Sequence, residues 1–259
     1  MPRAKRTYFP GMLWHLTQRC HDRSFLLRFE EDRRNWLNWM LEAKRRYELS
    51  ILNYTVTSNH VHLVVLDDGP PGSIAEAMHL ASGQTAQDYN LRKKRRGAFW
   101  DDRYHATAVD TDMHFLRCLF YIDLNMVRAG VVGHPRDWRD CGFQEIVGLR
   151  ERYRLIDRQK LCRMLHVAER DLERSYARWM EAYMQKPRLT RESCWTESIA
   201  VGSECFVNRV KKELGLRAIY RKIKGGEGFF RLEEEPKRWR YPMRKAGRLE
   251  SNSGPRNGF

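Results

Sequence analysis

Hydrophobic and polar positions along the first half of the chain follow two periods in turn. The two-residue alternation of strands covers residues 12–20, 50–57, 60–66 and 105–109. The period of helices, near 3.6, covers residues 30–47, 73–92 and 110–128. This order, β-α-β-β-α-β-α, is typical of a ferredoxin-like antiparallel sheet with helices on one face. We therefore expect an α+β fold whose other sheet face is open.

The helix expected at residues 110–128 has two different faces, and Asp110 or Thr111 is placed to cap it. Its apolar stripe, which should face the core, consists of Phe115, Leu119, Ile122 and Met126. The opposite edge carries polar side chains at helical spacing, namely His114, Arg117, Tyr121, Asn125 and, if the helix continues that far, Arg128. A tyrosine at helical spacing is ordinarily a core residue, whereas this one lies off the stripe and among cations.

Two histidines two residues apart lie on the apolar strand 60–66. Side chains alternate along a strand, so His60 and His62 point to the same face of the sheet. The pair can be half of a divalent-metal site, or it can be two half-exposed strand histidines that bond to water or backbone. Asn125 lies one turn after Tyr121, so its amide oxygen could complete a metal site. His15 also projects from a strand and is a reserve ligand.

Composition indicates an anionic partner. The chain has 259 residues, a net charge of +15, a pI near 9.8 and 42% hydrophobic residues, so it can bury a core while keeping a basic surface. Nucleic acid is the leading candidate. No stretch approaches the roughly 18 apolar residues of a membrane span, and the start lacks the apolar segment of a signal peptide. We expect a cytoplasmic protein whose six cysteines are reduced.

Five blocks of residues carry a family resemblance. The run from Tyr121 to Gly130 resembles the Tyr-Ile-x-x-Asn-Pro-Val-Arg-Ala-Gly signature of single-tyrosine transposases of the His-hydrophobic-His class, and the closest group is the REP-associated tyrosine transposases. Blocks at residues 15–19, 58–63, 100–104 and 135–138 agree in order, over about residues 5 to 146. Met126 replaces the usual Pro and Cys20 the usual Gly, and neither position is catalytic in the family.

The resemblance implies a chemistry and a substrate. Tyr121 would attack a phosphodiester to give a 5′-phosphotyrosine intermediate and a free 3′-hydroxyl. A divalent metal, Mg²⁺ or Mn²⁺, held by His60, His62 and Asn125 would assist, and no nucleotide cofactor such as ATP or NAD is required. The implied substrate is single-stranded or hairpin DNA, a palindrome flanked by a short recognition tetranucleotide, and in a bacterial cell the protein would then be associated with the nucleoid.

A loop before the strand 105–109 combines cations with aromatic rings, as expected of a groove in which phosphates meet charge and unpaired bases stack. A solvated loop would have a similar charge. The expected DNA-binding residues are Arg19, Lys93, Lys94, Arg95, Arg96, Trp100, Arg103, Tyr104, Arg117 and Arg128.

The alternation stops after residue 148. Helical patterns follow at residues 157–166, 168–185 and 203–214, and a turn at residues 201–203 allows a helix-turn-helix. Residues 217–259 hold 12 Lys and Arg against 5 Glu with little apolar periodicity. We therefore expect a catalytic domain at 1–148, a helical region at 149–216 and a basic, weakly ordered extension at 217–259.

Two other classes of function compete with the transposase. One is a noncatalytic DNA-binding regulator of hairpin elements with the same fold, which would have no need to keep the histidines, the tyrosine and Asn125 together. The other is an RNA-binding ferredoxin-like module, which would need aromatic residues on its central strands, and the strand at 60–66 has none. The sequence allows a monomer or a homodimer.

Overall fold

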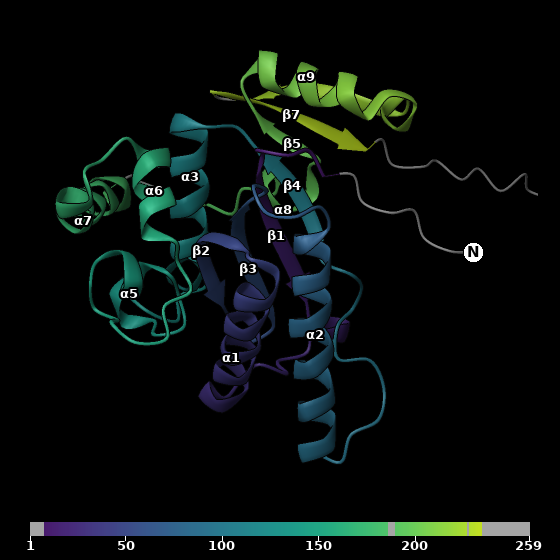
Figure 1. Ribbon diagram of the computed structural model, residues 1–259, viewed down its shortest axis with the longest axis vertical. Coiled ribbons are helices and arrows are strands. Elements are labelled where there is room, and N and C mark those ends of the chain that lie inside the picture. The colour runs from purple at the N-terminus through teal and green to yellow at the C-terminus, as the bar shows by residue number, and fades with distance from the viewer. Residues whose placement is uncertain (1–7, 186–189, 227, 235–259) are drawn as a thin grey trace, which may run out of the picture.

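The computed structural model describes residues 8–185, 190–226 and 228–234. Within these residues, seven strands form one sheet in the order β2-β3-β1-β4-β5-β7-β6 (Figure 1). Their bounds are β1 Leu13–Arg19, β2 Ser50–Val56, β3 His60–Leu66, β4 His105–Val109, β5 Ala200–Gly202, β6 Arg221–Gly226 and β7 Phe229–Glu234. All neighbouring strands are antiparallel except the parallel pair β4 and β5.

The first four strands confirm the predicted fold class. The central strand β1 pairs with β3 on one side and with β4 on the other, and β2 pairs with β3, which is the ferredoxin-like order. The predicted bounds of β3, β4 and the first two helices agree with the structure, because these segments have strong, uninterrupted periodicity.

The helices follow the same chain order. The longer ones are α1 Glu30–Tyr47, α2 Ser73–Arg92, α3 Asp112–Asp123, α6 Arg158–Leu165, α7 Leu172–Met184 and α9 Glu204–Leu214. Single-turn elements are η1 His21–Arg23, α4 Asn125–Arg128, η2 Pro135–Asp137, α5 Phe143–Ile146, η3 Glu169–Asp171, α8 Cys194–Glu197 and η4 Gly215–Ala218. In the described part of the chain we find no helix whose length and apolar content would let it cross a membrane.

Helices cover both faces of the sheet. The pair α1 and α2 packs side by side on one face, as predicted, while α3 lies against β2 and β4 and next to α6 (Figure 1). The prediction of an open sheet face was wrong, because the apolar stripe of α3 and the fully buried Trp195 of α8 cover that face. His62 is consequently only 1% exposed.

The region after residue 148 contributes strands as well as helices, and the sheet runs across the expected domain boundary. Residues 200–202 form β5, so the helix-turn-helix is not formed. Residues 221–226 and 229–234 pair as antiparallel strands where a weakly ordered extension was expected. The basic composition of this segment suggested a solvated chain. In the structure its cations are neutralised by cross-strand pairs such as Lys224 with Glu233 (2.7 Å), which allows the strands to form. Residues 235–259 of that expected extension lie outside the described residues.

Candidate active site

Three segments converge on one buried site. Strand β1 supplies His15, β3 supplies His60 and His62, and the junction of α3 and α4 supplies Tyr121 and Asn125. In the register of β1 and β3, the residue opposite His60 is Arg19 and the residue opposite His62 is Thr17. The ring centroids of His62 and Tyr121 lie 5.9 Å apart, so the tyrosine lies next to the histidines of its own chain.

The two strand histidines and the amide of Asn125 form a donor set. Nδ2 of Asn125 lies 3.3 Å from Nε2 of His60 and 3.1 Å from Nε2 of His62. A 180° turn of the amide places its oxygen at the same point, facing both ring nitrogens. Burial lowers the pKa of His60 to about 3 and that of His62 well below its usual range, so both rings are neutral ligands.

These three side chains fit a divalent metal. Two imidazole nitrogens and one amide oxygen suit Mg²⁺ or Mn²⁺ with further positions left for water or phosphate. Among the described residues, no three His, Cys, Asp or Glu side chains converge on a common point, so the candidate centre depends on Asn125 as its third ligand.

A break in the helix positions Asn125. The predicted continuous helix ends at Asp123, Leu124 adopts φ −81° and ψ 7°, and α4 begins at Asn125. Asp123 is 1% exposed and accepts hydrogen bonds from Oη of Tyr176 (2.6 Å) and Nδ2 of Asn53 (3.0 Å). These bonds anchor the end of α3 to β2 and α7, directly behind Tyr121.

Removing one donor to Asp123 should therefore weaken the fold. We expect Tyr176→Phe to lower the free energy of unfolding by about 1–3 kcal/mol, because a buried carboxyl group loses a hydrogen bond. Urea denaturation measures this loss. Tyr153→Phe, at a tyrosine 76% exposed, is the control and should cost little; equal losses in the two variants would contradict the role assigned to Tyr176.

Tyr121 lies among rings and cations. It is 4% exposed, Trp195 lies 6.3 Å from it between ring centroids, and the guanidinium of Arg128 lies 4.2 Å above its ring. Burial raises the pKa of the Tyr121 phenol, while the charges of Arg128, Arg191 and Arg19 act in the opposite direction. Because the raised pKa lies above the ordinary value near 10, the phenol is neutral at physiological pH.

His15 is not positioned as the reserve metal ligand that the sequence suggested. It is fully buried on the central strand, its ring is nearly parallel to that of His62 with centroids 5.0 Å apart, and its Nε2 lies 2.8 Å from Nδ1 of His62. Because both of its nitrogens are directed at protein atoms, it lies behind the donor set rather than in it.

The expected DNA-binding residues divide into groups. Arg19 and Arg128 lie at the site, where their charges lower the pKa of His60. Arg117 instead pairs with Glu192 (3.1 Å) and lies over the ring of Phe229, so its charge is compensated within the protein.

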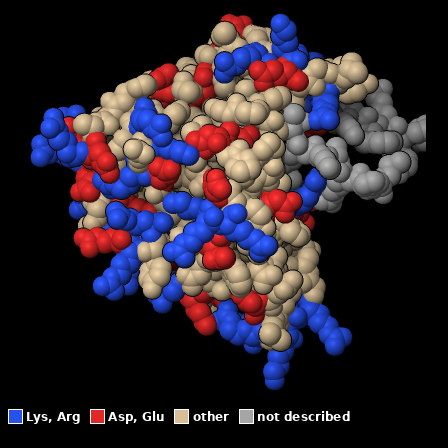
Figure 2. All heavy atoms as spheres, viewed as in Figure 1, with Lys and Arg blue, Asp and Glu red and all other residues tan. Residues whose placement is uncertain are grey.

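The basic loop follows the end of α2. Lys93, Lys94 and Arg96 are exposed, and Arg95 donates to the carbonyl of Ala98 (2.8 Å). Figure 2 shows Lys and Arg side chains at the lower end of the molecule, where α2 ends, and across the middle of this face, mixed with acidic residues.

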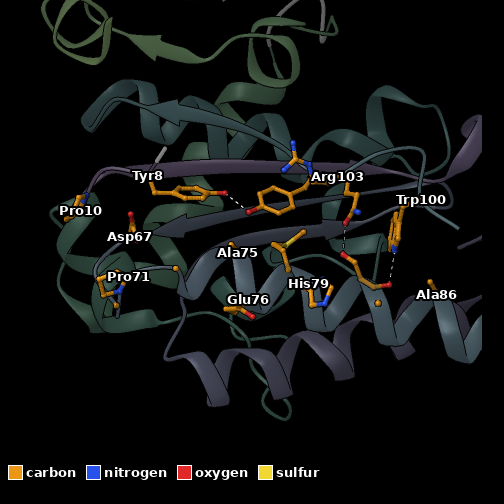
Figure 3. Close-up of a pocket in the computed structure, with 17 residues that line it drawn as sticks. Tyr8, Pro10, Asp67, Pro71, Ala75, Glu76, His79, Ala86, Trp100 and Arg103 are labelled. Atoms are coloured by element: carbon orange, nitrogen blue, oxygen red, sulfur yellow. Dashed lines mark hydrogen bonds between the residues drawn. The ribbon is translucent and has the colours of Figure 1, made fainter. Parts of the chain in front are cut away.

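Trp100, Arg103 and Tyr104 line a cavity of about 700 Å³ beside α2 (Figure 3). The indole of Trp100 donates to the carbonyl of Ser82 (2.9 Å). Gln18 also lines the cavity and lies next to Thr17 on β1, so it points to the opposite face of the sheet from the histidines. These aromatic residues are therefore on the α2 face, away from Tyr121.

Sequence reasoning missed the segment before β5. Arg191 is close enough to affect the pKa values of Arg19, His60 and Tyr121, and the carbonyl of Trp195 lies 2.7 Å from Nδ1 of His15. No local pattern could have revealed these contacts, since they join residues about 70 to 180 positions apart and one of them involves a backbone atom.

The fold and the site define an α+β protein in which a His-hydrophobic-His strand faces a helix tyrosine. The family model described as Transposase IS200 like matches residues 9–125. This stretch, less than half of the chain, is therefore similar to the IS200-like transposases, and it contains every residue of the donor set and Tyr121. The family recognised from the sequence blocks is confirmed at this level.

Two solved structures are similar to the chain. One is described as the structure of the REP associates tyrosine transposase bound to a REP hairpin, with 22% identity, a TM-score of 0.45, and coverage of 58% of this chain and 89% of that one. The other is a putative transposase from Deinococcus radiodurans R1, with 16% identity, a TM-score of 0.32, and coverage of 44% and 89%. No curated protein sequence matches the chain.

Proposed function

We propose that the chain is a metal-dependent endonuclease and strand transferase that acts on single-stranded DNA at palindromic, REP-like hairpins. The observation that carries this proposal is the position of Tyr121, whose ring lies 5.9 Å from that of His62 beside a three-ligand donor set. A nucleophile, a metal site and two arginines then surround one point.

The reaction is a transesterification at phosphorus. The phenol oxygen of Tyr121 forms a bond to the phosphorus as the bond to the 3′-oxygen breaks, the phenol proton passes to water, and the leaving oxygen takes up a proton to become a 3′-hydroxyl. The 5′-phosphate stays on the tyrosine. In the reverse step a 3′-hydroxyl attacks the phosphotyrosine and rejoins a strand, so no external energy source is needed.

The arginines bind and orient the phosphate. Arg128 is held over the Tyr121 ring and donates to the carbonyl of Tyr121 (2.6 Å), which fixes its guanidinium against the ring of the attacking residue. Arg19 reaches the site from the end of β1, opposite His60. Together they place a phosphodiester for in-line attack. A divalent ion held by His60, His62 and Asn125 would supply Lewis-acid polarisation of a phosphate oxygen.

A single strand is the natural substrate, because the tyrosine must reach a backbone phosphate without an opposing strand. The preference for hairpins and for a flanking tetranucleotide rests on the sequence blocks shared with the REP-associated group. The basic loop at residues 93–96 adds phosphate contacts whose strength falls with salt.

The proposal is tested by a covalent adduct. Incubation with labelled hairpin DNA and Mn²⁺ should give a protein–DNA species that survives a denaturing gel and is lost with a chelator. The second candidate, a noncatalytic regulator, predicts hairpin binding without an adduct, and the close approach of Tyr121 to the donor set favours the enzyme.

The cavity beside α2 is proposed to hold an unpaired base of the hairpin. Trp100 and Tyr104 contribute aromatic rings to its lining. Arg103 lines it as well (Figure 3). Stacking on an aromatic ring contributes about 1–3 kcal/mol per base. A base bound there would hold the hairpin on the face opposite the tyrosine.

We expect Trp100→Ala to weaken binding of a hairpin that has an unpaired base by about tenfold, a loss of about 1.4 kcal/mol. Fluorescence anisotropy measures the affinity, with a fully paired hairpin for comparison. Trp179→Ala, on α7, is the matched control. An equal loss for both hairpins, or no loss, would contradict base binding in the cavity.

A further inference from the structure

We propose that His15 is a positioning residue, and that together with the backbone carbonyl of Trp195 it sets which ring nitrogen of His62 faces the donor set. The inference rests on the proposed metal site. It assigns a role in that site to the region after residue 148, which lies beyond the matched family stretch.

The hydrogen-bond chain has one direction. A carbonyl oxygen only accepts, so Nδ1 of His15, 2.7 Å from the Trp195 oxygen, must carry a proton. In a neutral ring Nε2 of His15 then has a free lone pair, and Nδ1 of His62, 2.8 Å away, must donate to it. The proton of His62 is thereby held on Nδ1, and its Nε2 lone pair faces Asn125.

A proton on Nδ1 of His62 suits its role as a metal ligand through Nε2. A ligating imidazole must present an unprotonated nitrogen, and its other N–H is commonly fixed by an acceptor. The hydroxyl of Thr17 lies 3.4 Å from Nε2 of His15 and 3.3 Å from Nδ1 of His62, longer than the direct contact between the rings. His15 is therefore the main acceptor for His62.

The Trp195 carbonyl is fixed from several sides. The hydroxyl of Thr107 on β4 lies 3.2 Å from it, and its single proton is shared between this carbonyl and that of Ser198, which is closer (2.7 Å). The indole of Trp195 is fully buried and donates to Glu192 (3.0 Å). The short helix α8 is thus bound to the sheet at the point where its carbonyl meets His15.

The other strand histidine is oriented differently. Nδ1 of His60 lies 2.9 Å from the hydroxyl of Thr57 and 2.7 Å from Oδ1 of Asn59, both in the turn just before it. The orientation of the His60 ring is therefore set by the turn just before it. The orientation of the His62 ring is set through His15 by Trp195, which follows His62 by more than 130 residues in the chain.

The first test needs no metal. In the metal-free protein at neutral pH, long-range ¹H–¹⁵N NMR spectra should show His62 with its proton on Nδ1 and Nε2 unprotonated. His15→Phe removes the acceptor and should convert His62 to a mixture of tautomers. His62 found with its proton on Nε2 in the unmodified protein would overturn the inference, even if no variant folds.

The second test is metal affinity. Mn²⁺ binding measured by calorimetry should weaken about 10-fold or more in His15→Phe, in the range seen when such orienting partners are lost. His15→Gln keeps an acceptor oxygen and should restore part of the affinity. Circular dichroism melting confirms that each variant is folded.

His105→Phe is the matched control. His105 lies on β4 with Nε2 2.8 Å from the carbonyl of Ser198, so it contacts the same segment without touching His62. The affinity of the His105→Phe variant for Mn²⁺ should stay within about twofold of that of the unmodified protein. Equal affinities in folded His15→Phe and His105→Phe would overturn the inference, while a correct His62 tautomer without any DNA adduct would count against the proposed function alone.

Discussion

Replacing Tyr121 with phenylalanine is expected to abolish the covalent adduct while hairpin affinity stays within about twofold. The ring keeps its contacts with His62, Trp195 and Arg128, so the site retains its shape and only the nucleophilic oxygen is lost. A denaturing gel measures the adduct, and anisotropy at the same salt concentration measures the affinity.

Tyr183→Phe is the control for this result. Tyr183 packs on the neighbouring Phe120 with ring centroids 4.9 Å apart, so its substitution perturbs the same helix without touching the donor set. The adduct should form at the normal level. If Tyr121→Phe still gave an adduct at that level, another side chain would be the nucleophile and the proposed chemistry would be wrong.

Loss of His60 is expected to lower metal-dependent cleavage by about 100-fold or more, since Lewis-acid stabilisation amounts to several kcal/mol. His60→Ala is a cleaner test than His62→Ala, because His60 is partly exposed, whereas His62 is buried and bonded to His15. The measurements are the single-turnover cleavage rate and the Mn²⁺ affinity, which should fall together.

His114→Ala is the matched control, because His114 lies on α3, on the polar edge predicted to include Tyr121, but outside the donor set. It should cleave at close to the normal rate. Normal cleavage by His60→Ala, or cleavage in a chelator, would remove the metal from the proposal and leave the tyrosine and the arginines to account for the rate.

The sequence predicted best where one local period decides the structure. The alternation of residues 60–66 gave both the strand and the shared face of His60 and His62, and the spacing of Tyr121 and Asn125 anticipated their approach to the histidines although Leu124 interrupts the helix. Periodicity alone was sufficient for these features because each depends on neighbours within a turn or a strand.

The contacts that were missed depend on distant chain segments. The polar His15 and His62 are buried because Trp195 arrives from α8, and Arg117 is compensated by Glu192 from the same region. The strand β5 has only three residues, Ala200–Gly202, and cannot be recognised without the edge of β4 that it joins. Tertiary pairing decides such elements, and their local sequence carries little signal.

The parallel strand β5 also limits how this protein can be divided. It occupies the edge of β4, so a chain cut at residue 148 would expose an unpaired strand edge, the usual starting point for aggregation. The same cut would remove the carbonyl that His15 meets. A fusion protein built from this chain should therefore extend through the end of β7 at Glu234, because the part before residue 148 does not contain all the residues that support its buried site.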